Sequence, residues 1–173
     1  MTNDSEVPTG FRVAPPEQVG QIVAVFARVQ WPLSVDGIDA VVSDLGWSRR
    51  PNVSRIEVVS SLPLARRDTT FLQRGDEVSE VSCWVTDPLK RGEDQKVVND
   101  AYYALHPVII AILGQPNNRG RDSWWDLPTG GRVHLKDLRR VVLLQLLSRW
   151  YADVERSEER LGISPDRVLG EDE

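Results

Sequence analysis

The stretch TTFLQRGDEVSEVSCWVT, residues 69–86, decides the fold class of this chain. It contains two runs rich in β-branched and aromatic residues, separated by Gly75-Asp76, a pair typical of a tight turn. In the second run apolar and polar residues alternate, so that one face carries Val81, Cys83 and Val85 and the other carries Glu80, Ser82 and Trp84. This two-residue period predicts a β-hairpin in a sheet with one covered face and one face partly open to water.

A second hairpin, a central strand and a long helix are expected after the first hairpin. The runs 123–127 and 132–136 flank Pro128-Thr129-Gly130-Gly131, whose turn chemistry predicts a strand on either side. Residues 141–147 form a near-continuous apolar run of strand length, which indicates a central strand. Helical spacing over 92–113 predicts a long helix between the hairpins. We expect this helix and Phe26 to cover the sheet residues Val81, Val85, Val141, Leu143 and Leu147.

The remaining elements complete an α+β domain. Helices are expected over 16–29 and 35–45, a strand over 55–62, and a short charged helix over 152–161. The order ααβββαβββα predicts a mostly antiparallel sheet of about six strands with two N-terminal helices, one long central helix and a short C-terminal helix. It is analogous to the order in small secretion chaperones. We expect one domain at 15–163, a flexible N-terminal arm at 1–14 and an acidic C-terminal tail at 164–173.

Composition and charge exclude several classes of protein. The net charge of −5 is concentrated after Asp153, and no basic stripe exists that could neutralise phosphates, so nucleic-acid binding is not expected. Cys83 is the only cysteine, which rules out an internal disulfide. The polar N-terminus is unlike a signal peptide, and the longest apolar stretch, 101–113, is too short to span a bilayer. We therefore expect a cytoplasmic protein without membrane contact.

The motifs of common catalytic and metal sites are absent from the sequence. One cysteine and two separated histidines, His106 and His134, do not make a zinc site, and we interpret both histidines as structural. Neither a nucleophile elbow nor a phosphate-binding loop occurs. Asp68 and Asp126 are the candidates for acid–base chemistry, although an ion pair between Asp126 and Arg132 across the hairpin is the simpler interpretation. We predict no catalytic, cofactor-binding or metal-binding residues.

The segment 124–132, WWDLPTGGR, is the most distinctive in the chain. Adjacent strand residues point to opposite faces, so one tryptophan can fill the core while the other meets solvent or a partner; burial of both is the alternative. We expect one of Trp84, Trp124 and Trp125 to be substantially exposed and to anchor a partner. The predicted partner-binding residues are Phe11, Arg12, Trp84, Trp124, Trp125, Asp126 and Arg132.

Five segments together carry a family resemblance. They are Val25–Pro32, Asp44–Trp47, Leu113–Pro116, Trp124–Gly131 and Ala152–Arg156. In this order they resemble an actinobacterial family of small immunity-factor-like proteins, similar to the immunity factor for the tuberculosis necrotizing toxin, an NAD-glycohydrolase. The resemblance implies an immunity protein, not an enzyme, that blocks a cognate protein toxin in a 1:1 complex. It also implies that this toxin is one that consumes NAD.

Two other functions stay open. A chaperone-like binder of a secreted protein would need an exposed apolar groove. A small-molecule enzyme would need a deep pocket that holds Asp68 or Asp126 with a strongly shifted pKa. If the immunity interpretation holds, the arm 1–14 is expected to enter the toxin's substrate cleft, with Phe11 supplying apolar contact and Arg12 a positive charge.

Overall fold

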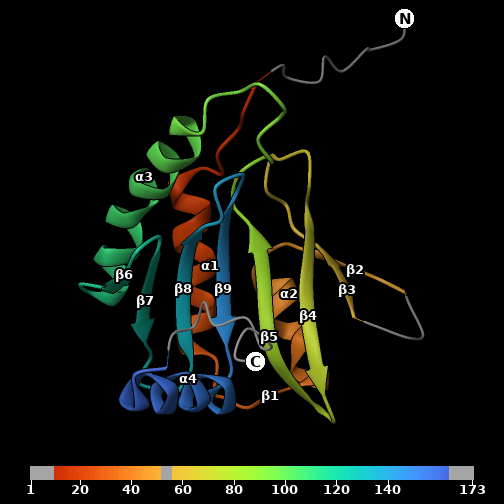
Figure 1. Cartoon of the computed structure of the whole chain (residues 1–173). Coiled ribbons are helices and arrows are strands. Elements are labelled where there is room, and N and C mark those ends of the chain that lie inside the picture. Colours follow the sequence, from red (N-terminus) through yellow and green to blue (C-terminus); the bar gives the residue numbers. More distant parts are fainter. Residues whose placement is uncertain (1–9, 52–55, 164–173) are drawn as a thin grey trace, which may run out of the picture.

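A computed structural model describes residues 10–51 and 56–163 (Figure 1). Within them, four helices accompany one nine-stranded sheet whose neighbouring strands all pair antiparallel, which confirms the predicted α+β class. The strands are β1 (Leu33–Ser34), β2 (Ser48–Arg50), β3 (Glu57–Val59), β4 (Asp68–Arg74), β5 (Glu77–Trp84), β6 (Asn117–Arg119), β7 (Asp122–Asp126), β8 (Arg132–Asp137) and β9 (Val142–Leu147). Their spatial order is β2-β3-β4-β5-β9-β8-β7-β6, and β1 pairs with the start of β5.

Six of these strands match the six that the sequence predicts, and the other three are short. β1, β2 and β6 have two or three residues each, too few for an alternating pattern to be recognised. β9 lies between β5 and β8, so its prediction as a central strand is confirmed. The sheet is thus the predicted one, extended at both edges by short strands.

The alternation in β5 is confirmed. Val81, Cys83 and Val85 are buried on the face that we call the inner face, whereas Trp84 and Glu80 are half-buried on the opposite, outer face. Phe71 in β4 pairs with Val81 and lies on the inner face as well. The two faces therefore differ in polarity as the hairpin sequence indicates.

The predicted face of β9 is wrong. Val142, Leu144 and Leu146 are fully buried on the inner face, whereas Leu143 is half-buried on the outer face opposite Trp84. Leu147 is buried on the outer face too, beside Arg132. Every residue of the run 141–147 but Gln145 is apolar, so the sequence contains no alternation that could assign its faces.

Three helices cover the inner face, and a fourth lies at one end of the outer face (Figure 1). They are α1 (Pro16–Arg28), α2 (Ile38–Asp44), α3 (Lys96–Leu113) and α4 (Arg149–Leu161). The first turn of the expected helix 35–45 is a 3-10 turn, Val35–Gly37. Gly20 lets α1 and α3 approach closely, because a Cβ there would lie 2.7 Å from a methyl group of Val108.

The segment before α1 is hydrogen-bonded to the residues that follow β5. The amide of Ala14 donates to the carbonyl of Val85, and the amide of Asp87 donates to the carbonyl of Arg12, each at 2.8 Å. Phe11 packs against the core. Residues 11–14, which we expected in a flexible arm, thus belong to the folded domain. Residues 1–9 and the expected acidic tail 164–173 lie outside the described residues.

Candidate functional site: the outer face of the sheet

Four of the seven predicted partner-binding residues lie together on the outer face. The strand registers place Trp124 beside His134, Asp126 beside Arg132, and Trp84 beside Leu143 on this same face. Trp84 and Trp124 are both half-buried. β9 and β8 separate β5 from β7, and the register places Trp84 level with Asp122, two residues before Trp124. Three strand spacings of about 4.8 Å and two residues along the strand put the two tryptophans about 16 Å apart. The outer face therefore presents two aromatic side chains on a rigid sheet.

Trp84 forms a stack with a cation from a loop. The guanidinium of Arg66 lies 4.7 Å from the centre of the Trp84 ring, within the range of a cation–π contact. Arg66 precedes β4 and is exposed. A ligand can therefore reach the hydrogen-bond donors at the edge of this guanidinium.

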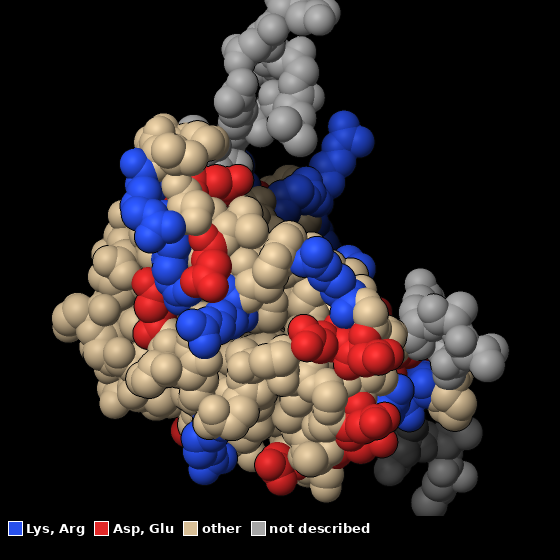
Figure 2. Space-filling view, turned by 90° about the horizontal axis from the view of Figure 1, so that it is seen from below, with Lys and Arg blue, Asp and Glu red and all other residues tan. Residues whose placement is uncertain are grey.

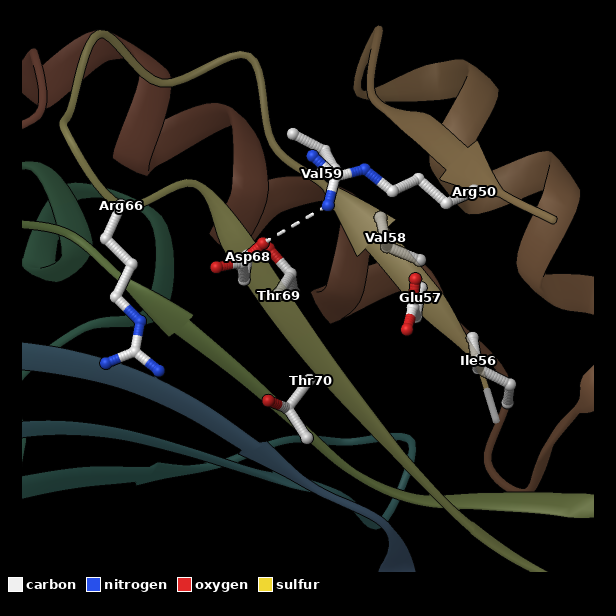
Figure 3. A pocket seen from close by; sticks show the side chains of 9 residues that line it. All are labelled: Arg50, Ile56, Glu57, Val58, Val59, Arg66, Asp68, Thr69 and Thr70. Carbon is white, nitrogen blue, oxygen red and sulfur yellow. Dashed lines mark ion pairs between the residues drawn. The ribbon is translucent and has the colours of Figure 1, made fainter. Parts of the chain in front are cut away.

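A pocket of about 330 Å³ borders this stack, between β2, β3 and β4 (Figure 3). Arg66 descends along one side of it toward Thr70, and Arg50 reaches across from β2 toward Asp68 (Figure 3). The Arg50 and Asp68 side chains are 3.9 Å apart and largely exposed, which makes them a loose ion pair. The pocket is thus polar and lies at the surface, with arginines on two sides.

The loop that carries Arg66 is held in place by a hydrogen bond to the side chain of Asp87. The buried carboxylate of Asp87 accepts a 2.7 Å hydrogen bond from the amide of Ala65 and a 2.6 Å bond from Nε of Arg12. Arg12 therefore positions the Arg66 loop through Asp87. The sequence interpretation predicted Arg12 as a charge for a partner and did not include this pairing, because Asp87 lies 75 residues further along the chain.

At the other end of the outer face, an ionic network fastens α4 to the sheet. Arg132 in β8 is only 1% exposed and binds three carboxylates: Asp126 across the hairpin at 2.9 Å, Glu155 at 3.0 Å, and Glu159. These hydrogen bonds outweigh burial and raise the pKa of Arg132. The predicted pair of Asp126 and Arg132 is confirmed, with two further partners that come from α4.

His134 extends this network. Its Nδ1 lies 2.8 Å from Asp122 and its Nε2 lies 2.8 Å from Glu155. Burial opposes the charged imidazolium, but hydrogen bonds to both carboxylates outweigh it, so the pKa of His134 is raised. By the same contacts the pKa of Glu155 is lowered despite its burial. These contacts favour the charged form of each group and join the sheet to α4, which agrees with the structural interpretation of this histidine.

The other predicted residues lie elsewhere. Trp125 is buried on the inner face and donates its Nε1–H to the carbonyl of Gly114 at 2.8 Å. None of the three tryptophans is exposed, so that expectation is wrong; Trp150, 51% exposed under the guanidinium of Arg74, is the exposed tryptophan of the described chain. It opens α4 one turn before the helix start that we expected, and a longer amphipathic pattern would have included it.

Ser123 of β7 and His106 of α3 lie within hydrogen-bond distance of each other. His106 Nε2 lies 2.9 Å from Ser123 Oγ, a distance that also occurs in nucleophile–base pairs. Ser123, however, is fully buried, and its hydroxyl is also bonded to Tyr102 and Asn118. A substrate has no access to this oxygen, so the contact stabilises the packing of α3 against β7.

Three further properties concern metal ligands, membrane-spanning helices and surface charge. Within residues 10–51 and 56–163, no group of three or more His, Cys, Asp or Glu side chains could hold a metal ion. None of the described helices is long and apolar enough to cross a membrane. Viewed from the α4 end, acidic and basic side chains lie interspersed among uncharged ones (Figure 2).

Comparison with known proteins gives one match. A family described as a family of unknown function (DUF6301) matches residues 17–148, about three quarters of the chain. The match includes all nine strands of the described sheet, and it ends just before α4. No curated protein and no solved structure matches the chain.

Proposed function

The chain belongs to this family of unknown function, DUF6301, and we propose that it is an immunity protein that binds and blocks a cognate protein toxin. The proposal includes an NAD-consuming enzyme as the target, a 1:1 complex and action in the cytoplasm. It rests on the resemblance of the five segments named above and on the surface chemistry of the outer face. An inhibitor of this kind needs a rigid surface and no catalytic group of its own.

One observation supports the proposal more than any other: the Arg66–Trp84 stack on the outer face. Tryptophan and arginine are the residue types most enriched among the energetically dominant contacts of protein interfaces. Here both are held on fixed backbone, Trp84 by β5 and Arg66 by a loop bonded to buried Asp87. Little conformational entropy is lost when a partner binds to such a prearranged pair.

The test is inhibition of a candidate toxin encoded beside this chain. We expect co-expression with the toxin domain to restore growth of a bacterial host, and a 1:1 complex in size-exclusion chromatography with light scattering. Trp84→Ala should weaken the complex by about 2 kcal/mol or more. Tyr103→Ala, which alters an exposed aromatic residue of α3, is the matched control and should bind normally. Equal weakening by both variants, or growth arrest despite the chain, would contradict the proposal.

A chaperone-like function is the alternative, and a groove between the N-terminal segment and α3 favours it. The groove has a volume of about 640 Å³, and its lining is mostly apolar with three carboxylates: Phe11, Val13, Val97, Ala101 and Ala104, together with Glu93, Asp94 and Asp100. A chaperone would use it to hold an unfolded secreted protein. Binding of the unfolded but not the folded toxin domain, abolished by Val97→Asp and kept by Trp84→Ala, would favour this function over the first.

The geometry of the two aspartates gives little support to an enzyme. Asp126 is partly buried, but hydrogen bonds from Arg132 and Arg156 outweigh burial and lower its pKa. A carboxylate of lowered pKa is a poor general base at neutral pH. Asp68 lies in an open polar pocket beside Arg50. Both carboxylates are therefore better suited to ion pairing.

A further inference from the structure

We propose that the Arg66–Trp84 stack is a receptor for a carboxylate: an aspartate or glutamate side chain of the partner inserts into the pocket beside β4 and pairs with Arg66. This inference deepens the proposed function and rests on it for the statement that the partner is a protein. The outer-face pocket then determines which residue of the partner is recognised.

The orientation of Arg66 supports a planar anion. A guanidinium that lies over a ring keeps the N–H groups of its edge free, and two of them match the two oxygens of a carboxylate. The aromatic ring shields one side of the cation from water, which strengthens an ion pair formed at the edge. Arg66 lines the pocket, so a side chain that enters it meets this edge.

The other charges of the pocket favour a single carboxylate over a polyanion. Glu57 and Asp68 line the same pocket as Arg50 and Arg66, so the charges there balance. Each additional phosphate of a nucleotide or nucleic acid would approach the exposed carboxylate of Asp68 and be repelled. A single carboxylate is repelled less than a polyanion, and the Thr70 hydroxyl lies on the same pocket wall as a further donor.

The position of Arg66 is maintained by contacts that a ligand does not have to create. Asp87 holds the amide of Ala65, and the amide of Ser60 donates to the carbonyl of Arg67 at 2.8 Å on the other side of Arg66. The backbone of the loop is thus bonded immediately before and after Arg66. This arrangement gives Arg66 a defined backbone position. The neighbouring Arg67 shares the anchored backbone but does not line the pocket, which makes it a suitable control.

The experiment is an NMR titration of the isotope-labelled chain, which needs no toxin. The probes are a blocked five-residue peptide with one central glutamate, the same peptide with glutamine, and inorganic phosphate. We expect the glutamate peptide to shift the Arg66 Nε–H and Trp84 indole N–H signals, with millimolar affinity and at least tenfold tighter than the glutamine peptide. Arg66→Met should abolish the shift at Trp84, and Arg67→Met, the matched control, should keep it.

Each other outcome overturns the inference. Equal shifts with both peptides would mean that the charge is not recognised, and loss of binding in Arg67→Met would mean that only the overall charge matters. Binding of phosphate without a response to the glutamate peptide would overturn the assignment to a protein carboxylate. Because no toxin is present, failure here leaves the growth-rescue test untouched, and failure of that test leaves this binding result standing.

Discussion

Replacement of Arg132 by methionine tests whether the ionic network fastens α4 to the sheet. Arg132 is 1% exposed, and its guanidinium joins Asp126 of the hairpin to Glu155 and Glu159 of α4. Methionine keeps much of the apolar stem of the side chain and fills irregular space, so the cavity left behind is small. The substitution therefore removes the charge and its hydrogen bonds more than it removes packing.

The magnitude follows from the burial of the groups left behind. Removing one partner of a buried ion pair costs roughly 3–5 kcal/mol, because the remaining charge is buried without compensation. Here the carboxylates keep some access to water, with side-chain exposures of 43%, 29% and 38% for Asp126, Glu155 and Glu159. Asp126 also keeps Arg156, and Glu155 keeps His134. We therefore expect the lower end of the range, a loss of about 3 kcal/mol in the free energy of unfolding.

Urea unfolding followed by tryptophan fluorescence measures this loss, and calorimetry gives the matching shift in Tm. About 3 kcal/mol corresponds to a Tm lower by about 6–12 °C in a domain of this size. Arg156→Met is the matched control: Arg156 is 25% exposed and pairs with Asp126 and Asp153, so its loss should cost about 1 kcal/mol or less. If Arg132→Met is no more destabilising than Arg156→Met, the network does not hold α4 in the way argued.

Three further predictions concern pH, packing and reactivity. Because the pKa of His134 is raised, its ion pairs stabilise the fold fully below about pH 6.5 and are lost as the pH rises through the higher pKa of the folded state. Tm measured between pH 6 and 9 should therefore fall less steeply in His134→Gln than in the unmodified protein or in His106→Gln. Parallel curves would contradict this. Gly131→Ala should lower the free energy of unfolding, measured in urea, by about 2 kcal/mol or more, since its Cβ would lie 2.5 Å from Nε1 of Trp31 and 2.9 Å from the carbonyl of Leu147. Gly120→Ala meets open space and should lower it only by the roughly 1 kcal/mol of its left-handed backbone. Similar losses in the two variants would argue against the close approach. Burial raises the pKa of the Cys83 thiol to about 12, so Ellman's reagent at pH 8 should label the protein only after unfolding in urea, and rapid labelling of the native protein would refute the burial.

The contact between Gly131 and Trp31 also explains two of the segments that carry the resemblance. Trp31 follows α1 in the segment Val25–Pro32, and Gly131 ends the turn between β7 and β8. The indole lies so close to Gly131 that a side chain there has no room. The sequence shows both residues, but only the fold shows that they lie against each other.

The candidate site was predictable in part. Trp84 was identified because it interrupts a polar face of an alternating strand, and Asp126 with Arg132 because the turn between them places them opposite each other. Arg66 was missed, since nothing in a polar loop indicates which strand residue its side chain will reach. The pairing of Arg12 with Asp87 was missed, because Asp87 lies far along the chain.

The sequence by itself determined the class of the fold, six of the nine described strands and the approximate limits of the helices. Those features depend on periodicity and turn chemistry within about ten residues, as in the β4–β5 hairpin around Gly75-Asp76. Tertiary structure alone decided which face of β9 is inner, that α4 closes over Arg132 and His134, and that Arg66 lies over Trp84. These depend on contacts between residues that are distant in sequence, where burial and charge pairing select among arrangements that are locally equivalent.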